Sequence, residues 1–166
     1  MAKPPKYATP ICIVLSVLAL IGIVWGMIAG NPLIPMILLI PTVIYEVYRT
    51  EGVSTTLSSW LLLVLFVANF IIIIFDIQFD LGSFLGTSSK YFYGYNVPLG
   101  DLRIVFPSVI GVLSIVLFTR TRGIYTRWLS VIIFITVIAI IHITDPEIFQ
   151  SILKLGVNEA IDRVNI

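Results

Sequence analysis

Five long runs of apolar residues, separated by more polar segments, dominate the pattern along the chain. They lie at 10–29, 33–48, 57–77, 102–119 and 125–143. A helix needs about 20 mostly apolar residues to cross a bilayer. A transmembrane strand would instead alternate in polarity over about ten residues, whereas these runs are apolar on every side. The pattern predicts an all-α, polytopic integral membrane protein with five transmembrane helices, forming a single transmembrane domain over 1–166.

Two of the polar segments are similar to each other at an offset of 71 residues, from Arg49 to Arg120. They share four identities and one Val/Ile exchange over seven positions, and each lies between two apolar runs. We therefore expect one helix followed by two repeated hairpins, with Gly52 and Gly123 at turns where positive φ favours glycine. Two short loops that converged on good turn chemistry would give the same pattern as a duplication. The segments are Arg49-Thr50-Glu51-Gly52-Val53-Ser54-Thr55 and Arg120-Thr121-Arg122-Gly123-Ile124-Tyr125-Thr126.

The composition supports a membrane location and excludes several classes of function. Hydrophobic residues make up 58% of the 166 residues, charged residues 11%, and the mean hydropathy is +1.07. Soluble domains are about 45–50% apolar and about 25% charged, and a short chain cannot hide such an excess in one aqueous core. Net charge is +1 without a basic tract, so nucleic acid is not an expected partner. The single cysteine, Cys12, lies in an apolar run and is expected to be a buried, inert thiol.

The basic residues near the predicted spans indicate an orientation, because cytoplasmic loops carry an excess of Lys and Arg. With the N-terminus in the cytoplasm, six basic residues lie inside and four outside. We therefore expect a multi-pass protein of the cell membrane with a cytoplasmic N-terminus, an outer C-terminus and both arginine-glycine bends in the cytoplasm. The inside residues are Lys3, Lys6, Arg49, Arg120, Arg122 and Arg127, and the outside ones are Lys90, Arg103, Lys154 and Arg163.

Within the spans, a few residues are candidates for packing between helices. Gly22 and Gly26 are four apart, so they would let another helix approach closely. Glycine is also simply common in membrane helices, and both interpretations stay open. Asn69 lies in the middle of the third span and is expected to form a hydrogen bond with a neighbouring helix.

Two segments outside the spans offer contact surface. The outer loop at 78–101 is long enough to be functional, and its aromatic cluster suits either partner docking or the headgroup level of the membrane. The tail at 144–166 has the periodicity of an amphipathic helix, which lies in the outer interface or packs against another subunit. The aromatic cluster consists of Tyr91, Phe92, Tyr93 and Tyr95.

The charged residues concentrate at the ends of the predicted spans. Three carboxylates and an imidazole near the outer interface are ligand types that bind a divalent metal, although no recognised ligand spacing is present and helix capping or solvation explains them more simply. A second charged group faces the cytoplasm, where it would bind lipid headgroups or form exposed ion pairs. The outer residues are Asp76, Asp80, His142 and Asp145; the cytoplasmic ones are Glu46, Arg49, Glu51, Arg120, Arg122 and Arg127.

No motif in the sequence supplies a reaction. Nucleotide loops, catalytic triads, paired haem-ligating histidines and zinc-protease helices are all missing, and the sequence requires no cofactor. We expect a non-catalytic integral membrane subunit of a larger complex, surrounded by lipid and other membrane subunits. A respiratory, photosynthetic or other oxidoreductase assembly would suit this role. The alternatives are a small transporter or channel with a site near the proline-bearing second and fourth spans, and a membrane enzyme or metal site at the outer interface.

Overall fold

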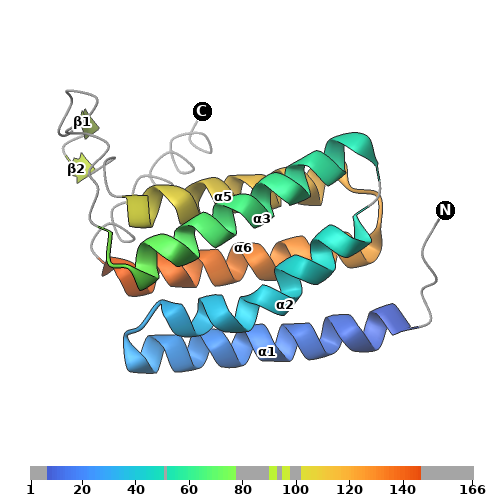
Figure 1. Ribbon diagram of the computed structural model, residues 1–166, viewed down its shortest axis with the longest axis horizontal. Coiled ribbons are helices and arrows are strands. Elements are labelled where there is room, and N and C mark those ends of the chain that lie inside the picture. Colours follow the sequence, from blue (N-terminus) through green and yellow to red (C-terminus); the bar gives the residue numbers. More distant parts are fainter. Residues whose placement is uncertain (1–6, 51, 78–89, 93–94, 98–101, 147–166) are drawn as a thin grey trace, which may run out of the picture.

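The protein is described here from a computed structural model that covers residues 7–50, 52–77, 90–92, 95–97 and 102–146. This part of the chain contains five α-helices and a pair of short antiparallel strands (Figure 1). The elements in chain order are α1 (Ala8–Ala29), α2 (Leu33–Arg49), α3 (Val53–Ile74), β1 (Lys90–Phe92), β2 (Tyr95–Val97), α5 (Leu102–Arg120) and α6 (Ile124–Thr144).

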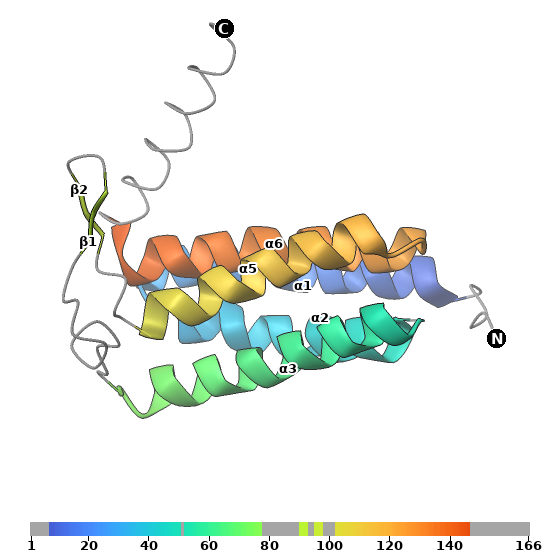
Figure 2. The same cartoon turned by 90° about the horizontal axis from the view of Figure 1, so that it is seen from above.

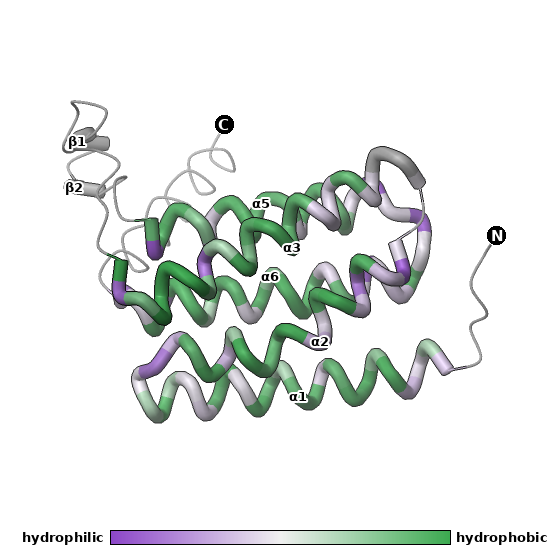
Figure 3. The backbone as a smooth tube through the Cα atoms, in the orientation of Figure 1, coloured by the Kyte–Doolittle hydropathy of each residue, from purple (hydrophilic) through white to green (hydrophobic). Residues whose placement is uncertain are grey.

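The prediction of a helical membrane protein is confirmed. Among the described residues, four helices are long and apolar enough to cross a membrane, namely Ala8–Ala29, Thr55–Ile74, Leu102–Arg120 and Ile124–Thr144. Hydrophobic residues cover most of their length, and hydrophilic ones gather towards the ends (Figure 3). Helix α2 has 17 residues and is not among these four. At about 1.5 Å per residue it is shorter than a hydrocarbon core of about 30 Å.

The helix bounds differ most from prediction at α3. It begins at Val53 rather than at 57 and ends at Ile74 rather than at 77. The first turn is polar, so a hydropathy pattern misses it. At the other end, Asp76 has a φ of +50°, a left-handed conformation that an α-helix cannot continue. Phe75 therefore forms the C-cap of α3.

Four of the helices form a closed ring. Helix α2 packs against α3, α3 against α5, α5 against α6, and α6 against α2. Helix α1 lies outside this ring and covers α2 and α6, and Figures 1 and 2 show the arrangement from two directions. Each predicted hairpin thus contributes two neighbouring helices to the ring, and α1 is the additional helix.

The interior of the ring is filled by large apolar side chains from all four helices. Because these side chains meet on every side, the ring encloses a packed core. The buried set includes Met36, Leu39 and Val43 of α2, Leu62 and Phe66 of α3, Ile110 and Leu117 of α5, and Ile133, Val137 and Ile140 of α6.

The contact between α1 and α2 depends on small residues. A Cβ atom at Gly26 would lie 2.5 Å from Cδ of Pro35, and one at Gly22 would lie 3.1 Å from Cβ of Leu38. Both glycines are buried. They therefore lie where sequence reasoning expected a close helix approach, and the second helix is α2 of the same chain.

The two ends of the bundle have different chemistry. The bend end carries the start of α1 and the two bends of the repeated segments (Figure 1). The loop end carries the end of α3 and the start of α5, which are joined there by an ion pair between Asp76 and Arg103. This pair links the two hairpins at the loop end.

The segment at 78–101, expected to be a loop, contains the antiparallel strands β1 and β2. Lys90 pairs with Val97, Tyr91 with Asn96 and Phe92 with Tyr95. Aromatic residues favour strands, and runs of three residues are too short to appear as alternating hydrophobicity. The predicted amphipathic tail lies outside the described residues, apart from its first three positions, 144–146.

The glycine contact generates the first test. Gly26→Ala should lower the free energy of unfolding by about 1–3 kcal/mol, because the rigid Pro35 ring blocks the added methyl group. Gly111→Ala is the matched control, since its Cβ would lie 3.8 Å from Val137 and alanine favours helix. Denaturation of both variants in the same detergent measures the difference. Equal stability of the two variants would contradict the packing.

Candidate functional site

A carboxyl group is fully buried at the bend end of the bundle. Glu46, in the last turn of α2, has an exposed fraction of 0%. Its Oε1 lies 2.7 Å from the Thr50 hydroxyl and 3.0 Å from the Ser59 hydroxyl, and both can donate to it. Its Oε2 is buried and has no hydrogen-bond partner among the described residues. Such an environment is costly for a charged group.

The local sequence explains how this cluster forms. Thr50 follows Glu46 by four residues, so both lie on one face of the same helical turn. Gly52, with a φ of +109°, then makes the tight bend into α3. The Ser59 hydroxyl also lies 3.0 Å from the Thr50 hydroxyl. Glu46, Thr50 and Ser59 thus form a triangle of side-chain oxygens between α2 and α3.

The two bends have matching hydrogen bonds at the offset of 71 residues. The Thr55 hydroxyl donates to the Gly52 carbonyl at 3.0 Å, and the Thr126 hydroxyl donates to the Gly123 carbonyl at 2.8 Å. One turn later, the hydroxyls of Ser59 and Ser130 lie 3.1 Å and 2.8 Å from the carbonyls of Thr55 and Thr126.

The second bend differs from the first in two respects. Gly123 has a φ of −76°, so the expectation of positive φ is correct for Gly52 and wrong for Gly123. Lack of room for a side chain explains the glycine at position 123, because a Cβ atom there would lie 2.8 Å from the Thr126 hydroxyl. The position equivalent to Glu46 is Leu117, which is fully buried in the apolar core. The carboxyl group is therefore specific to the first hairpin.

Two further polar side chains lie in the interior near the α2–α3 contact. Thr42 is one turn before Glu46, and its buried hydroxyl has no hydrogen-bond partner. Asn69 of α3 donates its amide to the sulfur of Met36 at 3.8 Å, which is the contact to a neighbouring helix that sequence reasoning expected. Its Oδ1 is without a partner.

Arg49 is only three residues after Glu46, but the two side chains do not form an ion pair. Its guanidinium carbon lies 4.6 Å from the centre of the Tyr125 ring, a cation–π contact with α6. Its Nη1 also donates to the Tyr45 hydroxyl at 3.4 Å. The Tyr125 hydroxyl in turn lies 2.9 Å from the Thr9 hydroxyl. Arg49 therefore joins α2 to α6, and Tyr125 joins α6 to α1.

The structure corrects the expectation for Glu46, which we placed among exposed charges that bind lipid or form ion pairs. The Glu46 carboxyl lies instead in the contact between α2 and α3, where the hydroxyls of Thr50 and Ser59 hydrogen-bond to it. Among the other residues of that group, Arg120, Arg122 and Arg127 are exposed, and Arg127 donates to the Thr121 carbonyl at 2.8 Å. Glu51 lies outside the described residues, so its expected contact with lipid headgroups or with an oppositely charged side chain stays a prediction.

The expected metal ligands lie towards the loop end. Asp76 forms the ion pair with Arg103, while His142 and Asp145 lie at the end of α6. Within the described part of the chain, no group of three or more His, Cys, Asp or Glu side chains is placed to hold a metal ion. Asp80 lies outside that part, so the four-residue metal site stays a prediction.

The aromatic cluster expected to dock a partner is only partly described. Tyr91 and Phe92 belong to β1 and Tyr95 to β2, with Phe92 and Tyr95 paired across the strands. Tyr93 lies outside the described residues. The docking role of the cluster stays a prediction.

Sequence reasoning missed Thr42, Thr50 and Ser59. The signal that could have found them is helical spacing, since Thr42, Glu46 and Thr50 recur every four residues. A polar stripe of this kind on an otherwise apolar helix predicts an inward face. The position of Ser59 requires knowledge of the bend geometry, which the sequence pattern does not provide.

The hydrogen bond between Ser59 and Glu46 can be tested by comparing equivalent positions. Ser59→Ala should lower the free energy of unfolding by about 1–2 kcal/mol, because it removes a donor to a buried carboxyl. Ser130→Ala is the control, since Ser130 is equally buried and its hydroxyl bonds only its own helix. It should cost less than half as much in the same denaturation assay. Equal losses would show that the carboxyl contact adds nothing.

Comparisons with protein-family models, with curated proteins and with solved structures found no match to this chain. The interpretation of the site therefore depends on its geometry alone.

Proposed function

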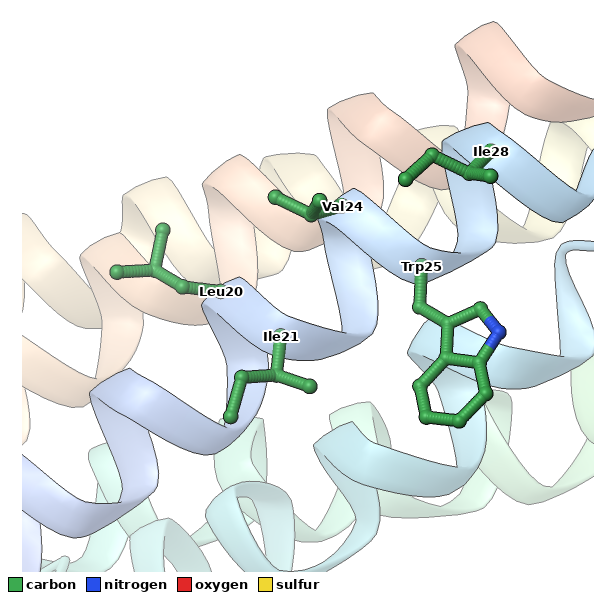
Figure 4. Close-up of a pocket in the computed structure, with 5 residues that line it drawn as sticks. All are labelled: Leu20, Ile21, Val24, Trp25 and Ile28. Carbon is green, nitrogen blue, oxygen red and sulfur yellow. The ribbon is translucent and has the colours of Figure 1, made fainter.

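We infer that the protein is a non-catalytic integral membrane subunit that docks against another membrane protein through α1. A single observation carries this proposal. The outward face of α1 presents a shallow apolar surface pocket of about 500 Å³, lined by Leu20, Ile21, Val24, Trp25 and Ile28 (Figure 4). A transmembrane helix of a partner offers apolar side chains that pack against such a surface.

The asymmetry of α1 supports this assignment. One face carries Gly22 and Gly26 and is used within the chain, against α2. Trp25 lies beside that face, at the edge of the outward surface, and has an exposed fraction of 62%. Tryptophan is enriched among the residues that contribute most to binding energy at interfaces. A helix outside the ring, with one face packed within the chain and a large exposed aromatic beside that face, suits a bridge to a second protein.

In the membrane, the proposed topology has five spans and a cytoplasmic bend end. Helix α2 counts as the second span because it lies inside the bundle, packed against three other helices, and a short span is accommodated by local thinning of the bilayer. The exposed arginines Arg120, Arg122 and Arg127 then meet anionic headgroups of the inner leaflet. The positive-inside rule favours the same orientation.

The two hairpins are further proposed to derive from a duplication. The matched hydrogen bonds at the bends support this, because they extend beyond the seven similar positions to Ser59 and Ser130. In the ring, α2 and α5 occupy corresponding positions, as do α3 and α6.

The docking role is tested by co-purification from native membranes in mild detergent. Trp25→Ala should weaken binding to a stoichiometric partner by about 2 kcal/mol, which is roughly 30-fold in the dissociation constant. Trp60→Ala is the matched control, because Trp60 is 54% exposed and belongs to α3. Quantitative mass spectrometry of the purified complex measures the difference. A protein that purifies alone, or a partner lost equally with both variants, would contradict the proposal.

A second candidate, a small transporter, is favoured by one observation. The buried carboxyl of Glu46 lies five residues after Pro41, inside the proline-bearing helix α2. Ionisable groups inside membrane bundles mark ion pathways. Flux of a solute or ion into liposomes that contain only this protein would support transport and count against the subunit role.

A further inference from the structure

We propose that Glu46 is a proton-binding site, in which the hydroxyl of Thr50 reverses its hydrogen bond when the carboxyl group gains or loses a proton while that of Ser59 stays on Oε1. The ligand is a single proton taken from water at the bend end. Binding forms one O–H bond on Oε1 and converts the carboxylate to a neutral carboxylic acid. A proton-binding Glu46 is compatible with either role proposed above and depends on neither.

The oxygen positions fit both protonation states. Each hydroxyl carries one hydrogen, so Thr50 and Ser59 can each donate only one bond at a time. With an ionised carboxylate, both donate to Oε1, at 2.7 Å and 3.0 Å. With a protonated carboxyl, Oε1 itself donates to Thr50, while Ser59 still donates to Oε1. The Thr50 hydroxyl then donates to the carbonyl of Glu46 at 2.8 Å.

The unpartnered oxygen favours the neutral state in the packed bundle. Oε2 is fully enclosed and accepts no hydrogen bond. An ionised carboxylate would place part of its charge on this oxygen without a donor, which is far more costly than an unpaired neutral carbonyl. The Thr42 hydroxyl, also buried and without a partner, lies one turn away on the same face of α2.

Within the described part of the chain, no Lys or Arg forms an ion pair with Glu46. Arg49 is directed to Tyr45 and Tyr125, and Arg127 to the Thr121 carbonyl. Helix α3 has no ionisable residue. The titratable groups at this end of α2 and of the helices packed against it are Tyr45, Tyr48 and Arg49 of α2, Cys12 of α1, and Tyr125 and Arg127 of α6.

A proton can reach the site through Thr50. This residue is 7% exposed, at the point where α2 ends and the first bend begins. Its hydroxyl is in hydrogen-bond distance of both Oε1 and the Ser59 hydroxyl. Rotation of one hydroxyl therefore connects the carboxyl to the bend end, and no helix has to move.

Infrared spectroscopy of the full chain in detergent tests the proposal. Near neutral pH the wild-type protein should show the C=O stretching band of a neutral carboxylic acid, shifted by exchange into heavy water. Glu46→Gln should abolish this band, because glutamine has no carboxylic acid group. Its amide can still donate to the neighbouring hydroxyls, so the contact between the helices is kept. Asp76→Asn is the control and should retain the band, since Asp76 is an exposed, ion-paired carboxylate. A wild-type spectrum without the band, or a band that persists in Glu46→Gln, would overturn the proposal.

The pH dependence of stability gives a second readout that is independent of the infrared spectrum. A folded state that keeps a proton on Glu46 binds more protons than the unfolded chain above about pH 5, where ordinary glutamate ionises. Stability then falls as pH rises. The midpoint of thermal unfolding should decline as pH rises above about 5 in the wild-type protein, and decline less in Glu46→Gln. Parallel curves for the two proteins, or a wild-type midpoint that rises with pH, would overturn the proposal.

Discussion

Lipid supplies no hydrogen bonds, so every polar group of a spanning helix has to find its partner inside the protein. This constraint explains most of the polar contacts in the bundle. Serine and threonine hydroxyls donate hydrogen bonds to backbone carbonyls of the preceding turn. Examples are Ser16 to Cys12, Ser108 to Ile104 and Thr136 to Ile132. Such bonds need no second helix. The Glu46 carboxyl cannot be satisfied in this way, and it therefore recruits Ser59 from α3. The need to satisfy this carboxyl inside the protein thus produces a hydrogen bond between α2 and α3.

The same constraint separates two kinds of helix contact. Where α1 meets α2, glycines let the backbones approach, and the contact is made by van der Waals packing. Where α2 meets α3 and α6, the ends of the helices are joined by polar contacts of Glu46 and Arg49. The hairpins are fixed at the opposite end by Asp76 and Arg103. Apolar side chains fill the long middle of the ring. Among the described residues there, Asn69 and Thr42 each have a buried oxygen without a hydrogen-bond partner.

The sequence predicts much of this architecture because hydrophobic length and glycine-containing bends are local signals. All five helices and the position of Gly52 follow from them. The strands β1 and β2 do not, since three residues are too few to establish a period. The closed ring and the outer position of α1 depend on which helix faces meet, and helices that are apolar all round carry little information about that. Glu46 is the clearest case: near a helix end a charge is expected in water, and only the bend geometry brings two hydroxyls to it.

In the proposed topology, the two hairpins have the same orientation and their bends share one face of the membrane. Single cysteines at Tyr48 and Arg122, which are exposed beside the two bends, test this directly in a Cys12→Ala background. With an impermeant maleimide, both positions should be protected in intact cells and labelled in inside-out vesicles. A cysteine at Ile77, at the loop end, should show the reverse. Labelling of positions 48 and 122 from opposite sides of the membrane would contradict the account.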